Sequence, residues 1–124
     1  SMDTLFEKAV RGKYRFPFKG MITVEDLWDL SLPGLDSVFK QLNKQKKVNE
    51  EESLLAVKSE ADIELENKIQ IVRYIVECKQ NEAMAKLVEK ENKAHNQKIL
   101  EIIERKQNKE LENMSIEELQ KQLK

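Results

Sequence analysis

The sequence has few of the residues that interrupt a chain, cross-link it or bind metals. Its 124 residues include three glycines, two prolines, one cysteine and one histidine. The single cysteine, Cys78, excludes an intramolecular disulfide, and with no signal peptide in view we expect a reducing cytosol. His95 has no second histidine or cysteine near it, so no metal site is expected. The scarcity of glycine and proline predicts a chain rich in helix.

Long apolar runs and a strong excess of one charge are also missing. No stretch approaches the ~20 apolar residues that a membrane-spanning helix needs. The 22 basic and 23 acidic side chains nearly cancel, whereas general nucleic-acid-binding domains are strongly basic. No nucleophile elbow, glycine-rich phosphate loop or histidine metal motif is present. We therefore expect no membrane partner, no cofactor and no enzymatic activity, and nucleic acid is a disfavoured partner.

Charged residues are abundant and unevenly placed. They make up 36% of the chain, against about 25% in typical globular domains. Residues 8–20 contain five basic side chains and no acidic one, whereas residues 50–66 contain seven acidic side chains and only Lys58 as a base. The chain therefore has a positive N-terminal segment followed by a negative junction.

Residues 13–30 combine basic, aromatic and turn residues more densely than any other stretch. Aromatic side chains occupy every second position from 14 to 18, a period typical of a short strand. Lys19-Gly20 supplies a turn, and Met21-Ile22 can pair back as a second strand. Thr23 and Asp26 have the spacing of a capping box. These features predict a β-hairpin followed by a short helix, in which we expect Trp28 at the centre of the local core.

Helical patterns occupy most of the remaining chain. A first helix is expected before residue 12, with Gly12 as a left-handed stop. Another should follow Pro33-Gly34, and the polar residues 48–53 are expected to be a flexible joint. Residues 59–108 contain no glycine or proline and predict a helix about 70 Å long if unbroken. Ser115 and Glu118 form a second capping box ahead of a final short helix.

The long helix carries an apolar stripe in its first half. Its members are spaced by threes and fours, as in coiled coils: Leu65, Ile69, Val72, Val76 and Ala83. Ile71 and Ile75 widen this stripe, so we expect this part of the helix to contact more than one neighbour. Arg73 lies inside it, and is expected to extend its charged end to solvent, to pair with acidic residues of another subunit or to point into a shared pocket.

The predicted fold class is mainly α. It comprises a small N-terminal head with a short β-hairpin and short helices, then a long coiled-coil-like helix and a short C-terminal helix. We expect residues 1–50 to form the head and residues 51–124 a helical oligomerisation region. Because apolar side chains lie on more than one side of the long helix, a homo-oligomer is predicted.

The basic and aromatic head residues are the strongest candidates for a ligand site. Guanidinium and ammonium groups suit phosphate, an aromatic ring can stack on a base, and polar groups downstream could close a pocket. The predicted ligand-binding residues are Arg11, Lys13, Tyr14, Arg15, Phe16, Lys19, Asn43 and Lys44. The alternative is that the aromatic rings form the core and the basic residues are the solvated side of an edge strand.

The chain resembles a widespread group of small phage-encoded proteins. The resemblance is carried by Arg15-Phe16, Lys19-Gly20 and the run Ile22-Thr23-Val24-Glu25-Asp26-Leu27-Trp28-Asp29-Leu30, and further along by Ile71-Val72-Arg73-Tyr74-Ile75-Val76 and Met114-Ser115-Ile116-Glu117-Glu118-Leu119. In size and oligomeric helical build such proteins are similar to the sponges with which phages sequester nucleotide signals of Thoeris or CBASS immunity.

This resemblance implies an oligomeric phage protein that acts in the cytoplasm of the infected bacterial host. It would bind an anionic nucleotide-like small molecule, such as a cyclic ADP-ribose-like or cyclic dinucleotide signal, and so counteract anti-phage defence. The alternative function is a coiled-coil protein-interaction module in phage replication, virion assembly or inhibition of a host protein.

Overall fold

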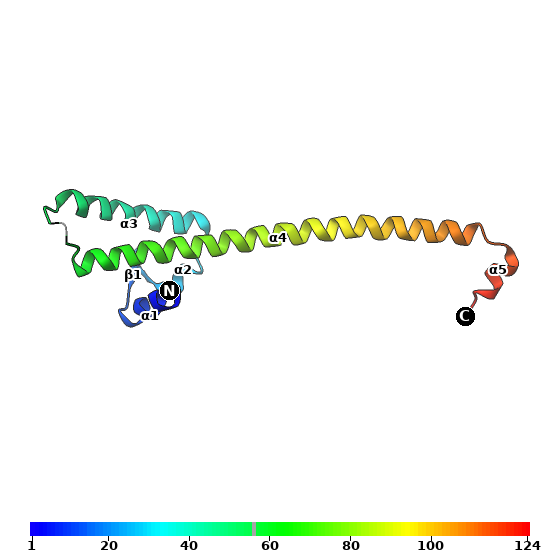
Figure 1. The fold of residues 1–124 in the computed structure, drawn as a ribbon, viewed down its shortest axis with the longest axis horizontal. Helices are drawn as coiled ribbons and strands as arrows, with labels where there is room; N and C mark the ends of the chain where they lie inside the picture. The colour runs from blue at the N-terminus through cyan, green and yellow to red at the C-terminus, as the bar shows by residue number, and fades with distance from the viewer. Residues whose placement is uncertain (56) are drawn as a thin grey trace. The chain divides into compact units, whose positions relative to one another are not determined.

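The computed structural model describes residues 1–55 and 57–124. The described chain is mainly helical, with one two-stranded antiparallel hairpin near its start (Figure 1). The elements in order are α1 (Met2–Arg11), β1 (Arg15–Pro17), β2 (Met21–Thr23), α2 (Val24–Leu27), α3 (Leu32–Glu52), α4 (Glu60–Glu112) and α5 (Ile116–Lys121). The predicted fold class is thereby confirmed, including the hairpin, the long helix and the short C-terminal helix. The long helix runs without a break from Glu60 to Glu112, which the sequence had left open.

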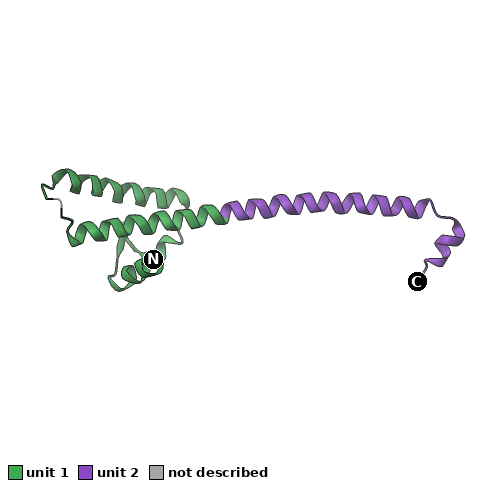
Figure 2. Ribbon diagram, in the orientation of Figure 1, with its two compact units in different colours: residues 1–82 green, residues 83–124 purple. Residues whose placement is uncertain are grey.

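The chain divides into two compact units, which Figure 2 shows in different colours. Unit 1 comprises Ser1–Glu82 and unit 2 comprises Ala83–Lys124, so α4 contributes residues to both. The first compact unit therefore extends well past residue 50, because the first part of α4 packs within it. A role of residues 51–124 in oligomerisation stays a prediction.

The hairpin and α2 form as their local sequence signals predict. Phe16 pairs with Ile22 across the hairpin, and Lys19 and Gly20 turn the chain with φ angles of 49° and 106°. The Thr23 hydroxyl accepts a hydrogen bond from the backbone N–H of Asp26, and the Asp26 carboxylate accepts one from the N–H of Thr23. That second bond holds the pKa of Asp26 below its ordinary value. Thr23 and Asp26 therefore start α2 as a capping box.

Gly12 ends α1, but not in the predicted left-handed conformation. Its φ is −79°, and Lys13, one residue later, has the positive φ of 51°. The Gly12 N–H donates to the Lys8 carbonyl at 2.8 Å, which keeps Gly12 in the helical region. A Cβ at Gly12 would lie 2.9 Å from that same carbonyl oxygen and 3.1 Å from the Tyr14 ring. Glycine is thus required here for space, while Lys13 makes the turn.

The first part of α4 packs against two neighbours within unit 1. Figure 1 shows α3 along one side of it and α1, β1 and α2 along another. On the side of the hairpin, Asn67 donates to the Tyr14 hydroxyl at 3.1 Å and Lys79 donates to the Leu30 carbonyl at 2.8 Å. On the side of α3, the Arg73 guanidinium lies 5.0 Å from the centre of the Phe39 ring. The predicted contact with more than one neighbour is confirmed.

Apolar side chains from both sides of α4 form one core. Its fully enclosed members include Ile71, Val72 and Ile75 of α4. The whole buried set is Ala9, Tyr14, Phe16, Val24, Leu27, Leu35, Val38, Leu42, Ile69, Ile71, Val72 and Ile75. Because these faces of α4 are covered within one chain, this part of the helix gives no reason for an oligomer. Any such reason lies in unit 2.

The sequence suggested that Trp28 lies at the centre of the core, and the structure shows that it does not. Its side chain is 39% exposed, whereas the neighbouring Leu27 is completely buried. α2 is only four residues long, and Trp28 is its C-terminal cap. Successive helical residues point about 100° apart, so when Leu27 faces inward Trp28 turns toward the edge of the core.

The predicted flexible joint at residues 48–53 is wrong, since α3 continues to Glu52. These residues are mostly good helix formers without glycine or proline, and Gln45 donates to Asn49 one turn on at 2.8 Å. α3 ends at Ser53, and α4 begins after a capping box in which Ser59 and Asp62 exchange hydrogen bonds. The connection between the two helices is therefore shorter than expected.

Candidate functional site

The four cations predicted to bind phosphate are all exposed, and three of them have separate local neighbours. Arg11 pairs with Glu7 one turn earlier on α1 at 3.2 Å. Arg15 donates from Nη1 to the carbonyl of Tyr14 at 3.0 Å. The Lys19 ammonium lies 5.6 Å from the centre of the Phe18 ring, and Lys13 lies in the turn after α1. In the single chain these groups do not converge on one enclosed pocket among the described residues.

The two aromatic residues predicted to stack on a base lie in the core. Tyr14 is 8% exposed and Phe16 is fully buried. The Tyr14 hydroxyl accepts the hydrogen bond from Asn67, which fixes the ring against α4. The ring faces are therefore covered by protein, as in the alternative that the aromatic rings form the core. Stacking on a base would require both rings to leave their present positions.

The other predicted residues fall on different parts of unit 1. Asn43 is half-buried and Lys44 exposed, both on α3. Gln41 of α3 donates to the Pro17 carbonyl at 3.3 Å, which ties this helix to β1. Of the predicted residues, Arg11 and Tyr14 do share a surface pocket, whose other lining residues are Thr4, Glu7, Lys8 and Gly12.

Lys68 is a cation of the head region that the sequence argument missed. Its ammonium lies 5.8 Å from the centre of the Tyr14 ring and 6.0 Å from that of Phe16. The side chain is only 15% exposed and forms an ion pair with Glu64 at 3.3 Å. A lysine inside the apolar stretch of α4 was the available signal, since such a residue must cover apolar surface with its stem.

A second aromatic cluster consists of Phe6, Trp28 and Tyr74. The Phe6 ring centre lies 6.1 Å from that of Trp28 and 5.7 Å from that of Tyr74. The thiol of Cys78 raises the pKa of the Tyr74 phenol, and the carboxylates of Asp3 and Glu77 add smaller contributions in the same direction. Because acidic groups border this cluster, it is poorly suited to a phosphate.

A groove of about 820 Å³ runs between α3 and α4 in unit 1. It is lined by Leu32, Pro33, Asp36, Phe39, Val72, Arg73, Val76, Glu77 and Gln80. The Arg73 guanidinium covers the Phe39 ring, so this arginine has an aromatic partner within its own chain. Its pairing with another subunit stays a prediction. Acidic and basic groups both border the groove, which gives it no single charge preference.

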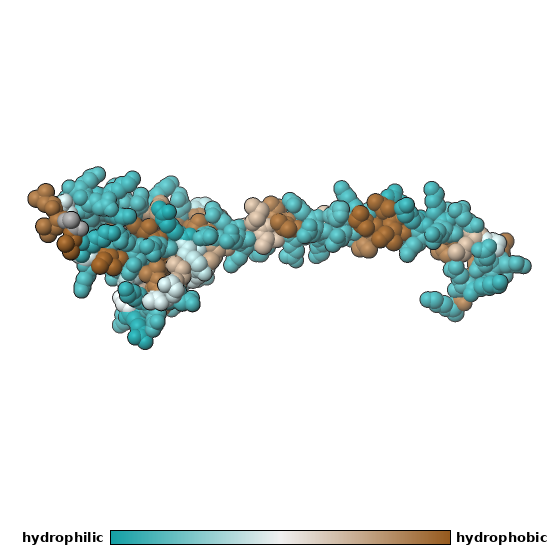
Figure 3. Space-filling model, in the orientation of Figure 1, coloured by the Kyte–Doolittle hydropathy of each residue, from teal (hydrophilic) through white to brown (hydrophobic). Residues whose placement is uncertain are grey.

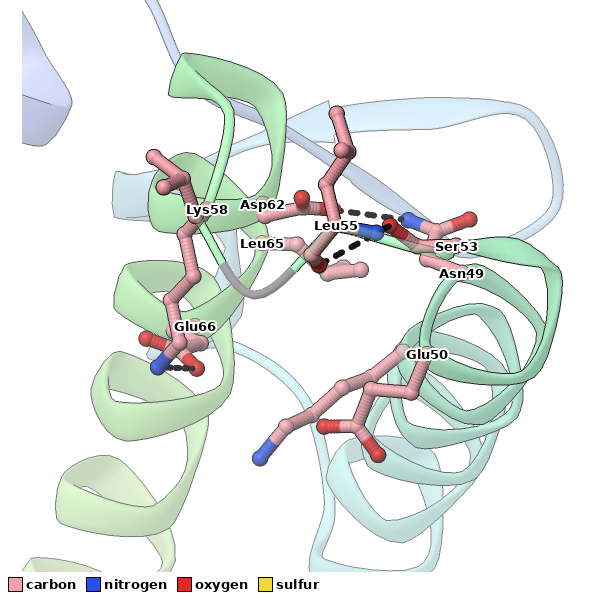
Figure 4. A pocket seen from close by; sticks show the side chains of 10 residues that line it. Asn49, Glu50, Ser53, Leu55, Lys58, Asp62, Leu65 and Glu66 are labelled. Atoms are coloured by element: carbon pink, nitrogen blue, oxygen red, sulfur yellow. Dashed lines mark hydrogen bonds and ion pairs between the residues drawn. The ribbon is translucent and has the colours of Figure 1, made fainter.

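A smaller pocket of about 170 Å³ lies where α3 and α4 are connected (Figure 4). Asn49 of α3 donates to Asp62 of α4 at 3.4 Å, and Lys58 forms an ion pair with Glu66. The hydrogen bond with the Ser59 backbone lowers the pKa of Asp62. These polar groups already satisfy one another, so the pocket fits a structural connection better than a ligand site.

Unit 2 exposes apolar side chains that nothing in the described chain covers. Figure 3 shows hydrophobic patches along the α4 part of this unit, separated by hydrophilic residues. Every residue from 83 to 124 is exposed except Met114, which is half-buried. The exposed large apolar residues are Met84, Leu87, Val88, Ile99, Leu100, Ile102, Ile103, Leu111, Ile116, Leu119 and Leu123. This helical surface is the strongest candidate interaction surface of the chain.

Metal-binding clusters and membrane-spanning helices are absent from residues 1–55 and 57–124. No group of histidine, cysteine, aspartate and glutamate side chains there could hold a metal ion. No helix of that part of the chain combines the length and the apolar character needed to cross a membrane. Comparison of the chain with protein-family models, with curated proteins and with solved structures returns no match.

Proposed function

We propose that the chain is a protein-interaction module that associates with another helix through unit 2. The observation that carries this proposal is the row of uncovered apolar side chains between Met84 and Leu123. Burying one leucine, isoleucine or valine is worth about 1.5–3 kcal/mol. A helix without tertiary contacts is at best marginally stable in water. A partner that covers this row would therefore stabilise the helix as it binds.

The resemblance of residues 15–30 to small phage-encoded proteins favours a phage setting. The partner would then be another copy of the chain, a phage replication or virion protein, or a host protein. The site of action would be the cytoplasm of the infected bacterium. In this arrangement unit 1 is the folded platform, and the surface of unit 2 makes the contact.

Changing Ile99 and Ile102 together to lysine should abolish this association. Both side chains are exposed on α4, and lysine favours helix about as well as the residues it replaces, so the helix itself should persist. We expect the wild-type chain to sediment above its monomer mass, or to retain a stoichiometric partner when isolated from infected cells. The double variant should do neither, while the fluorescence of Trp28 in unit 1 stays as in the wild type.

Gln97→Lys is the matched control, because this exposed polar residue lies about 200° around the helix from Ile99, away from the apolar side chains. It should keep the association. A wild-type chain that is monomeric at micromolar concentration and retains no partner would contradict the proposed function.

The second candidate function is sequestration of an anionic nucleotide-like molecule, such as a cyclic ADP-ribose-like or cyclic dinucleotide immune signal. Lys68 favours it, because this residue adds a cation from α4 beside Tyr14 and Phe16, the two residues that flank Arg15 in the sequence. In this version phosphate is held by cations alone, since both aromatic rings are buried. A second copy of the chain would have to close the site.

Calorimetry against a panel of such signals tests this candidate. We expect Arg15→Ala and Lys68→Ala each to weaken binding at least about tenfold, since a charge-assisted hydrogen bond to phosphate contributes about 1.5–3 kcal/mol. Lys40→Ala is the control, because Lys40 is exposed on α3 and pairs with Asp36. The bound signal should be released intact on heating. Absence of binding to every member of the panel would contradict sequestration.

A further inference from the structure

The exposed side chains of α4 in unit 2 follow a nearly palindromic order of apolar and polar residues along the helix. One row follows the coiled-coil spacing of threes and fours: Ala85, Val88, Asn92, His95, Ile99 and Ile102. The two ends of this row are apolar and its centre is polar. Figure 3 shows the corresponding hydrophobic patches on α4 with a hydrophilic stretch between them. Such a row can pair with a reversed copy of itself.

In an antiparallel pair, each residue of this row lies opposite a residue of similar polarity in the other copy. Val88 of one copy lies opposite Ile99 of the other, Ala85 opposite Ile102, and Asn92 opposite His95. All three pairings belong to one register, because the two residue numbers add up to the same value in each. The apolar ends then cover one another, and the polar centre pairs amide with imidazole. One polar layer within an apolar seam is a known way to specify register.

The charges that flank this row favour the reversed orientation. Glu89 and Glu91 flank its first half, whereas Lys98 and Arg105 flank its second half. Antiparallel pairing brings Glu91 of each copy beside Lys98 of the other, so the same ion pair forms twice. A parallel pair would instead place His95 against His95 and, one turn beyond Ile102, Lys106 against Lys106. The two Lys106 side chains carry like charges, which oppose that orientation.

We infer that unit 2 binds a second copy of the chain, with residues 85–102 of the two α4 helices antiparallel and Val88 opposite Ile99. The inference rests on the proposed function and names the partner of the same surface. The contact is isologous, so it closes on two copies rather than growing into a filament.

Disulfide trapping in the full-length chain tests the orientation. In a Cys78→Ser background, Val88→Cys and Ile99→Cys are made separately, one of them with a tag that changes its mass. We expect an equimolar mixture to form a disulfide between the two different variants under mild oxidation, because opposite positions come within bonding distance. Either variant alone should remain largely uncross-linked. Efficient self-linking of Val88→Cys would mean a parallel pair and would overturn the inference.

A charge reversal gives a second measurement that does not depend on cysteine. Glu91→Lys should weaken self-association roughly tenfold in sedimentation, because two ion pairs become repulsions. Adding Lys98→Glu to the same chain should restore it, since the pairs re-form with reversed sign. Failure of the double variant to recover would count against this register.

The remaining outcome separates this inference from the proposed function. If the wild-type chain is monomeric but retains another protein, and Ile99→Lys with Ile102→Lys abolishes that binding, then self-pairing is wrong and the interaction module stands. If the chain neither self-associates nor retains a partner, both are wrong.

Discussion

Replacing Phe16 by alanine is expected to lower the free energy of unfolding by about 3–5 kcal/mol, as is usual when a buried phenylalanine is removed and its cavity stays partly open. Phe16 is fully buried and belongs to the cluster that joins β1, α3 and α4. Chemical denaturation followed by circular dichroism measures the loss. Met21→Ala in the facing strand is the control, since Met21 is mostly exposed, and it should change stability by well under 1 kcal/mol.

This result also decides between two roles for Phe16. If the ring were a stacking platform, its removal would reduce ligand binding and leave stability nearly unchanged. A Phe16→Ala variant with wild-type stability would therefore show that the ring is not held in the core.

Replacing Ile71 by aspartate is expected to unfold unit 1 altogether. Ile71 is completely buried where α4 packs within the core, and an unpaired carboxylate there costs more than the about 4 kcal/mol that marks an exceptional substitution. The single tryptophan, Trp28, packs beside Phe6 and Tyr74, so its fluorescence reports on unit 1. Measured without denaturant, the variant should have the emission spectrum that the wild-type chain has in denaturant.

Gln70→Asp is the matched control, because Gln70 is the exposed neighbour of Ile71 on the same helix. It introduces the same charge and should leave the fluorescence as in the wild type. If Ile71→Asp also kept a native spectrum, α4 would not be part of the core of unit 1, and the division of the chain into its two units would need revision.

The two units differ in what makes them stable, and this difference bears on function. Unit 1 has a buried core, which includes both faces of α4 that the sequence suggested would need another subunit, although some of its apolar side chains, such as Leu54 and Leu55, stay exposed. Unit 2 buries none of its large apolar side chains within the described residues. The need for a partner therefore belongs to residues 83–124. The interaction proposals concern that unit, whereas the phosphate-binding proposal concerns the head and Lys68.

Local signals were sufficient to predict the elements. The capping boxes at Thr23, Ser59 and Ser115 start α2, α4 and α5, because a cap joins residues only three positions apart. The alternation around Phe16 likewise predicted the hairpin. The absence of glycine and proline after residue 59 predicted a long helix, although it left open whether that helix is continuous. Each of these features depends only on residues close together in the chain, so the sequence is enough to predict it.

Only the tertiary structure decided which side chains are covered. The sequence marked Trp28 as a core residue and Tyr14 and Phe16 as possible stacking surfaces, yet Trp28 lies at the edge and the other two are enclosed. Lys68 reaches the head from a helix more than fifty residues further along the chain. Burial depends on which distant elements meet, and a one-dimensional pattern shows that a residue is apolar without showing what covers it. The sequence by itself therefore determined the helices and the hairpin, and their packing decided which surfaces remain to bind a partner.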